Sequence, residues 1–123
     1  MEVQLSILNT SDTPIYRQLY DQIAFQVIRG ELSGGYCLPP IRALAGQLGI
    51  SVISIKRAWE ELERDGFIHT MVGRGCFVAY LSYEVRIEKR ISLALEEFSG
   101  CAATFRALGM SPEDVLRLVK ENY

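Results

Sequence analysis

Two short amphipathic segments separated by a tight turn most constrain what this chain can fold into. In the first segment, apolar residues recur at i, i+3, i+4 and i+7, which predicts a short helix over residues 40–47. Gly49 ends this helix, and Ser51 is placed to cap the start of the next one. Helix, glycine-containing turn and helix together are the pattern of a helix-turn-helix motif. The apolar residues of the first segment are Ile41, Leu44, Ala45 and Leu48.

The second segment, 51-SVISIKRAWEEL-62, could be a strand or a helix, because Val52, Ile53 and Ile55 are β-branched. A strand would alternate apolar and polar residues, and Val52 and Ile53 break that alternation. Ile50 and Ile55 have the spacing of a hydrophobic staple around a helix start. One apolar face then continues through Ile55, Ala58, Trp59 and Leu62. The sequence therefore predicts one helix over 52–65, with Trp59 in the core and Val52 and Ile53 facing outward.

A longer helix is predicted before this motif, over about residues 14–29. Thr13 is expected to be its N-cap, and Pro14 suits the first helical position because no backbone N–H is needed there. Gly30 is a natural end. The apolar stripe of this helix is formed by Ile15, Leu19, Ile23, Val27 and Ile28.

A β-hairpin is predicted after the third helix, which Gly66 ends. Residues 67–72 and 76–80 are strand-like, and the glycine-bearing stretch 73-GRG-75 between them suits a hairpin loop. Three helices followed by a hairpin form a winged helix-turn-helix. The predicted fold class is therefore mainly α, with a β-hairpin wing.

The chain changes character after Tyr80, which suggests two regions, residues 1–80 and 81–123. Apolar residues then alternate in steps of four and three up to Leu108, as in a coiled-coil seam, and Ser111-Pro112 begins a second helix. This tail could serve dimerisation, form a small-ligand pocket, or pack on its own domain. The seam favours dimerisation, because the tail is too short for a sizeable core and needs a partner. The residues predicted to dimerise are Ile87, Ile91, Ala94, Phe98, Phe105 and Leu108.

The distribution of charge is more informative than the net charge of −2. No acidic residue lies between Leu32 and Trp59, where Arg42, Lys56 and Arg57 are cationic. Residues 66–83 also carry no acid, and Arg74 is their only charge. The pattern indicates a locally cationic surface on an acidic protein.

The sequence gives little indication of a metal site, a disulfide, a catalytic centre or a membrane span. The three cysteines are far apart and match no metal or disulfide spacing, so we expect buried or inert thiols, and His69 is the only histidine. We therefore expect no metal site, no cofactor and no enzyme activity. No stretch approaches the roughly 18 apolar residues of a membrane span. The start, MEVQLSILNT, lacks the cations of a secretion signal, so a cytoplasmic location is expected.

The run 38-LPPIRALAGQLGISVISIKRAWEELERDGFIHTMVGRGCFVA-79 resembles the DNA-binding domain of GntR-family bacterial transcription regulators. The matching motifs are Leu38-Pro39-Pro40-Ile41-Arg42-Ala43-Leu44-Ala45, Leu62-Glu63-Arg64-Asp65-Gly66-Phe67-Ile68 and Gly73-Arg74-Gly75-Cys76-Phe77-Val78. The resemblance extends back to 14-PIYRQL-19 and so covers about residues 10–80. The short helical tail resembles that of the YtrA subfamily, in which this region serves dimerisation.

The resemblance implies that residues 52–65 are the recognition helix in the major groove and that 73-GRG-75 is the tip of the wing. Arg42, Ser51, Ser54, Lys56 and Gly73 fall on the family's DNA-contact positions, and Arg74 and Gly75 complete the wing-tip motif. Pro40 departs from the family pattern, because it replaces a common serine. Val52 and Ile53 also depart, because they replace polar contact residues, and their apolar side chains suit thymine methyl groups. With Arg57, the predicted DNA-binding residues are Arg42, Ser51, Val52, Ile53, Ser54, Lys56, Arg57, Gly73, Arg74 and Gly75.

These observations predict a homodimeric, sequence-specific transcription regulator, with repression the expected mode, acting on a palindromic double-stranded DNA operator. A small-molecule effector would need a pocket of roughly 300–1,000 Å³, which so short a tail builds only if both subunits contribute. One alternative is a winged-helix module that binds proteins and not specific DNA. Another is a relative of GntR proteins fused to an aminotransferase-like enzyme, but no such domain follows residue 80 and no lysine lies in a cofactor-binding context.

Overall fold

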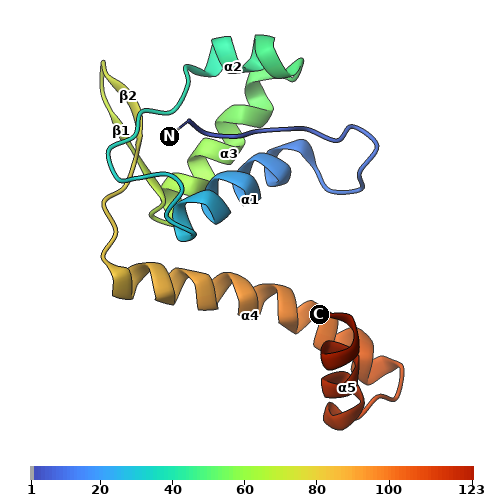
Figure 1. The fold of residues 1–123 in the computed structure, drawn as a ribbon. Helices are drawn as coiled ribbons and strands as arrows, with labels where there is room; N and C mark the ends of the chain where they lie inside the picture. The colour runs from blue at the N-terminus through green and yellow to red at the C-terminus, as the bar shows by residue number, and fades with distance from the viewer. Residues whose placement is uncertain (1) are drawn as a thin grey trace. The chain divides into compact units, whose positions relative to one another are not determined.

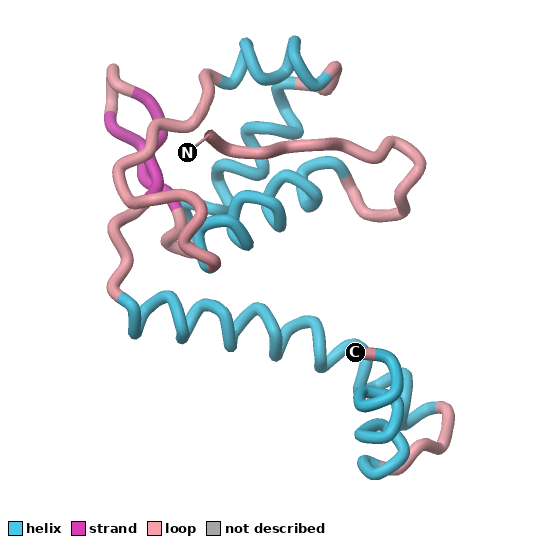
Figure 2. The backbone as a smooth tube through the Cα atoms, viewed as in Figure 1, coloured by secondary structure: helices cyan, strands magenta, loops and turns pink. Residues whose placement is uncertain are grey.

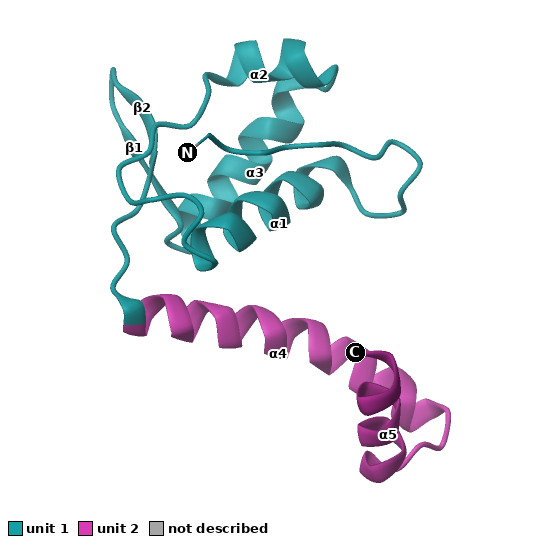
Figure 3. Ribbon diagram, viewed as in Figure 1, with its two compact units in different colours: residues 1–83 teal, residues 84–123 magenta. Residues whose placement is uncertain are grey.

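The computed structural model describes residues 2–123. The chain divides into two compact units, residues 1–83 and residues 84–123 (Figure 3). Within the described residues, no helix is both long enough and apolar enough to cross a membrane.

The first unit contains three helices and a β-hairpin (Figure 1). Its helices are α1 (Ile15–Ile28), α2 (Ile41–Leu48) and α3 (Val52–Arg64). Its strands, β1 (Ile68–Met71) and β2 (Gly75–Val78), pair in antiparallel orientation. The predicted winged helix-turn-helix is confirmed, and 51-SVISIKRAWEEL-62 is helical after its first residue.

Helix α3 is at the centre of this unit, because it packs against α1, α2 and β1. Its buried side chains are those predicted from the spacing, and Trp59 is only 4% exposed. Burying a large apolar side chain contributes roughly 1.5–3 kcal/mol, so this one face holds the three-helix unit together. The buried residues of α3 are Ile55, Ala58, Trp59 and Leu62.

The predicted stop and start signals agree with the helix ends except at the beginning of α1, and α2 lies one residue later than predicted, at residues 41–48 and not 40–47. Gly49 ends α2 in the left-handed conformation, with φ of 67°, and Ser51 caps α3. Thr13, however, is not the cap of α1: Pro14 occupies the N-cap position, and no side chain caps this end. The reason is that Pro14 is still extended, with ψ of 148°, so the helix begins one residue later than expected.

The hairpin loop is shifted by one residue from the predicted 73-GRG-75. Met71 pairs with Gly75, so the loop is Val72-Gly73-Arg74 and Gly75 begins β2. The Arg74 N–H donates to the Met71 carbonyl at 2.9 Å, which closes the turn. Gly73 has φ of 77°, a conformation that glycine adopts without steric cost.

The second unit consists of α4 (Tyr83–Ala107), which begins at the unit boundary, and α5 (Pro112–Asn122). Ser111 caps α5 through a capping box with Asp114, as the sequence predicted for the serine. Neither helix contains a buried residue. Leu108, predicted in the seam of the helix, instead lies in the turn after α4.

The cysteines differ from the expectation of burial. Cys37 and Cys101 are exposed and Cys76 is half-buried. Cys37 is exposed because its segment runs along the outer edge of the hairpin, where it forms a bridge with Phe77. All three are free thiols, and residues 2–123 contain no cluster of side chains that could hold a metal ion.

Candidate DNA-binding surface

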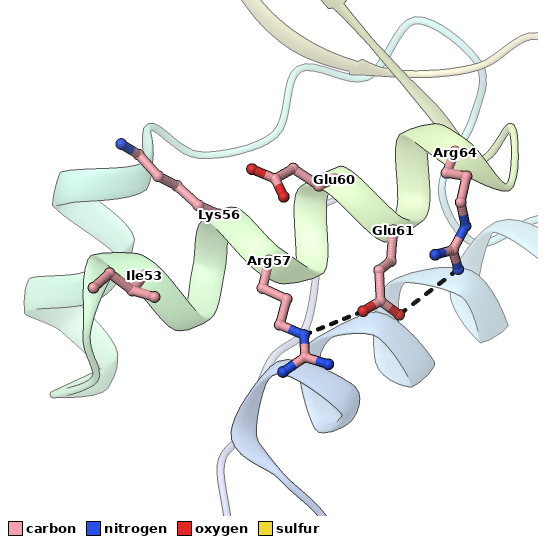
Figure 4. Close-up of a pocket in the computed structure, with 6 residues that line it drawn as sticks. All are labelled: Ile53, Lys56, Arg57, Glu60, Glu61 and Arg64. Carbon is pink, nitrogen blue, oxygen red and sulfur yellow. Dashed lines mark hydrogen bonds and ion pairs between the residues drawn. The ribbon is translucent and has the colours of Figure 1, made fainter.

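The outward face of α3 carries a mixture of apolar and charged side chains. Ile53 is 78% exposed, and Lys56 and Glu60 are also exposed. Figure 4 shows Ile53, Lys56, Arg57, Glu60, Glu61 and Arg64, the six residues that line an open hollow along this helix. Val52 is half-buried, so the prediction that it faces outward together with Ile53 is wrong. The reason is that Val52 is seven residues, about two helical turns, from the buried Trp59.

Lys56 and Arg57 are adjacent in sequence but point in different directions (Figure 4). The Arg57 guanidinium lies 3.7 Å from the centre of the Tyr16 ring on α1, and its Nε is 3.3 Å from Glu61 Oε2. Lys56 points away from that pair. Within residues 2–123, no ion pair joins Lys56, Arg42 or Arg74 to a carboxylate. These three cations are therefore more available to an external anion than Arg57.

The carboxylates near the end of α3 are mostly engaged within the protein. Glu61 pairs with Arg57 and with Arg64, whose Nη2 is 3.8 Å away. Glu63 accepts from the Thr70 hydroxyl at 2.9 Å, and Asp65 accepts from the Tyr20 hydroxyl at 2.5 Å.

Arg64 also binds a neighbouring carboxylate. It hydrogen-bonds to Asp65, and this bond raises the pKa of Arg64 above its ordinary value. The acids that follow the cationic start of α3 are thus largely compensated, and within the described residues only Glu60 of this group has no hydrogen-bond or ion-pair partner.

The first turn of α3 is closed by two serine hydroxyls. Ser51 Oγ accepts from the Ser54 backbone N–H at 3.1 Å, which confirms Ser51 as the N-cap. The Ser51 hydroxyl donates to Ser54 Oγ at 3.0 Å, so the Ser54 hydroxyl keeps its own proton for another acceptor. Ser51 is exposed and Ser54 half-buried.

The remaining predicted residues lie on α2 and on the wing. Arg42 is exposed on the first turn of α2, the helix that packs on α3. Arg74 is exposed in the hairpin loop between Gly73 and Gly75. No atom lies within 4 Å of where a Gly73 side chain would begin, so the loop tip is open to solvent.

Two features of this surface were not predicted from the sequence. Glu60 lies on the outward face of α3, which its helical position one turn after Lys56 could have indicated. The contact of Arg57 with Tyr16 depends on how α1 packs beside α3, and no local signal reports it.

Comparison with known proteins identifies the family of this fold. Residues 15–78, just over half of the chain, match the family described as bacterial regulatory proteins, gntR family. The chain belongs to the GntR family. It is therefore a DNA-binding transcription regulator and not an enzyme, as the sequence predicted.

Individual relatives cover most of the chain. The HTH-type transcriptional regulator YhcF of Bacillus subtilis is 34% identical over 89% of this chain and 90% of its own length. The HTH-type transcriptional repressor YtrA of the same organism is 28% identical over 90% of this chain and 85% of its own. A GntR family transcriptional regulator from Listeria monocytogenes superposes with a TM-score of 0.76 at 25% identity, covering 92% of this chain and 98% of its own. This similarity to short regulators confirms the YtrA-like assignment.

The cap of α3 provides a test of this geometry. Replacing Ser51 with Ala leaves the Ser54 N–H without its acceptor, and we expect the free energy of unfolding to fall by about 1 kcal/mol. Replacing Ser51 with Asp keeps a capping oxygen and should restore most of that loss. Urea denaturation measures both, with Ser92→Ala, at an exposed serine of α4, as the control. Equal stability of the Ala and Asp variants would contradict the cap.

Proposed function

We propose that this GntR-family regulator is a homodimeric repressor that acts in the cytoplasm on a palindromic operator. The observation that carries the proposal is the start of α3, where Ile53 and Lys56 are exposed while the opposite face is buried, and where Lys56 has no ion-pair partner among residues 2–123. A helix of this kind suits the major groove, and two of them would enter successive grooves roughly 34 Å apart. The similarity to the repressor YtrA supports repression as the mode of action.

The contacts divide into two kinds in this proposal. Arg42, Arg74 and the hydroxyls of Ser51 and Ser54 bind phosphates, which fixes the position of the protein without reading sequence. Ile53 and Lys56 read base edges, with Ile53 packing on a thymine methyl group. Gly73 and Gly75 let the wing backbone approach the DNA closely.

Val52 and Arg57 have supporting roles. Val52 is half-buried and contributes by holding the first turn of the helix in place. Arg57 is held by Tyr16 and Glu61, so a phosphate contact by this residue would have to compete with both.

An unbiased selection of DNA sites by the purified protein tests the proposal directly. We expect enrichment of a two-fold symmetric sequence with thymine at one position of each half-site. Ile53→Ala should relax the preference at that position while non-specific affinity is retained, because only the methyl contact is lost. The matched variant Val52→Ala should keep the thymine preference. If no symmetric site were enriched, a specific operator would be ruled out.

The salt dependence of DNA affinity distinguishes cations that contact phosphate from cations that are only exposed on the surface. Replacing Arg42 or Arg74 with Ala should each lower the slope of log affinity against log salt by about one, because one fewer counterion is released, whereas Lys56→Ala should weaken binding mainly through the lost base contact. Arg29→Ala is the control: this arginine is exposed too, but Glu31 holds it at 2.6 Å. Fluorescence anisotropy on a fixed duplex at several salt concentrations measures the slopes. Unchanged affinity and slope in all three variants would favour the protein-interaction module instead.

We further propose that residues 1–80 form the DNA-binding domain and that residues 81–123 form the dimerisation region. Helix α4 extends over 25 residues with no buried side chain, and Phe98 is 54% exposed within the chain. Ile91 and Ala94 are exposed as well, whereas Ile87 and Phe105 are half-buried. Leu108, 69% exposed, would extend the same surface into the turn after α4. A row of exposed apolar side chains is stable in water when a second copy of the chain covers it.

The dimer interface can be tested with two charge-matched variants. Phe98→Glu places a carboxylate in the apolar seam, so we expect the dimer dissociation constant to rise at least tenfold, measured by analytical ultracentrifugation. Ser92→Glu adds the same charge to an exposed position outside the seam and should leave the dimer intact. A chain truncated after Tyr80 that remained dimeric with unchanged operator affinity would show that the assignment is wrong.

A further inference from the structure

Within the described residues, the N-terminal segment of the chain forms no helix or strand and is drawn as a loop in Figure 2. It nevertheless lies along α1. We call residues 3–8 the arm. Three glutamines on α1, each one helical turn after the last, contact it: Gln18, Gln22 and Gln26. We call these three residues the glutamine ladder. None of them belongs to the DNA-binding surface.

Each glutamine of the ladder binds both backbone groups of a single arm residue. Gln26 Oε1 accepts from the Gln4 N–H at 3.1 Å, and its Nε2 donates to the Gln4 carbonyl at 2.8 Å. Gln22 binds Ser6 in the same way, at 2.9 and 2.7 Å. Gln18 binds Leu8 at 2.9 and 3.0 Å. The three carboxamides thus act as the edge of a β-strand would.

The spacing of helix and strand explains why the pairing repeats. Residues four apart on a helix are separated by about 6.0 Å along its axis. Residues two apart on a strand are separated by about 6.6–6.8 Å. The mismatch is below about 1 Å per step, which the flexible glutamine side chains absorb. Both periods are general properties of the backbone, so the match does not depend on the side chains of the arm.

The arm is recognised through its main chain on one edge and through apolar side chains on one face. Gln4, Ser6 and Leu8 give their backbone groups to the ladder while their side chains are exposed. The alternate residues Val3, Leu5 and Ile7 are half-buried. The ligand that fits is therefore any extended segment with small or aliphatic residues at alternate positions.

Hydrogen bonds to the protein's own carbonyl groups orient two side chains of the ladder. Gln26 is only 5% exposed, and its Nε2 also donates to the Gln22 carbonyl at 3.0 Å. Gln18 Nε2 also donates to the Thr13 carbonyl at 2.9 Å. These bonds fix the carboxamide orientations of Gln26 and Gln18, so the Oε1 atoms of these two residues are aimed at the N–H groups of the arm.

We propose that the glutamine ladder is a binding site for an extended peptide backbone, with the arm as its resident ligand. The site accepts the same segment supplied as a separate peptide when the arm is removed from the chain. This binding site stands on its own and does not rest on the proposed operator or on dimerisation.

Hydrogen exchange in the intact protein is the first test. We expect the amide protons of Gln4, Ser6 and Leu8 to exchange at least tenfold more slowly than those of Leu5 and Ile7, measured by NMR. Gln22→Met keeps the shape of the side chain but removes both bonds, so protection at Ser6 should be lost. The matched variant Gln47→Met, at an exposed glutamine on α2, should change nothing in the arm. Uniform exchange along the arm would overturn the proposal.

Peptide binding in trans is the second test. A chain that begins at Ser11 is mixed with a labelled peptide of residues 2–11, and we expect saturable binding by fluorescence anisotropy. N-methylation of the peptide at Ser6 removes an N–H that faces the ladder and should weaken binding at least tenfold. N-methylation at Leu5 makes the same chemical change on the opposite edge and should have a much smaller effect.

The two tests together decide the outcome. Equal binding of the two methylated peptides, or no binding to a shortened chain with intact helical circular dichroism, would refute the peptide site. If the shortened chain did not fold, the exchange pattern in the intact protein would decide, because it requires no truncation.

Discussion

The buried face of α3 is the constraint on which the rest of the first unit depends. Ile55, Trp59 and Leu62 fill the space between α1, α2 and the hairpin, so the rotation of α3 about its own axis is fixed. Once that face is buried, the position of every other residue on the helix is determined by the 3.6-residue period. Ile53 and Lys56 are exposed because they lie off the core face, and this links the packing of the domain directly to the proposed DNA-binding surface.

Helix α3 carries equal numbers of acidic and basic residues, and their arrangement leaves cations exposed near its start. The acids follow the exposed start of the helix, and internal partners compensate most of them, with Glu61 between Arg57 and Arg64 as the clearest case. Lys56 near the opposite end has no such partner within residues 2–123. A helix N-terminus already carries partial positive charge, so a lysine there adds to a field that favours phosphate. The local field therefore favours DNA despite the net charge of −2.

Much of this arrangement could be predicted from the sequence, because it follows from local rules. Gly49, Ser51 and the apolar spacing specify the helix-turn-helix through backbone conformation and capping. The hairpin loop was displaced by one residue, since glycines at both 73 and 75 allow either register. What could not be predicted depends on contacts between distant segments. The contact between Arg57 and Tyr16 is one such case, and the pairing of the arm with the ladder is another.

The second unit cannot be stabilised in the same way as the first. With no buried residue in α4 or α5, it cannot gain from its own packing the free energy that orders a helix of this length. The capping box at Ser111 contributes only about 1 kcal/mol, far less than that cost. In the proposed homodimer, the stability of this unit would come largely from a partner surface, which a second copy of the chain would supply by symmetry. Folding of the tail and pairing of two DNA-binding domains would then be a single event, which occurs only at concentrations where the dimer forms.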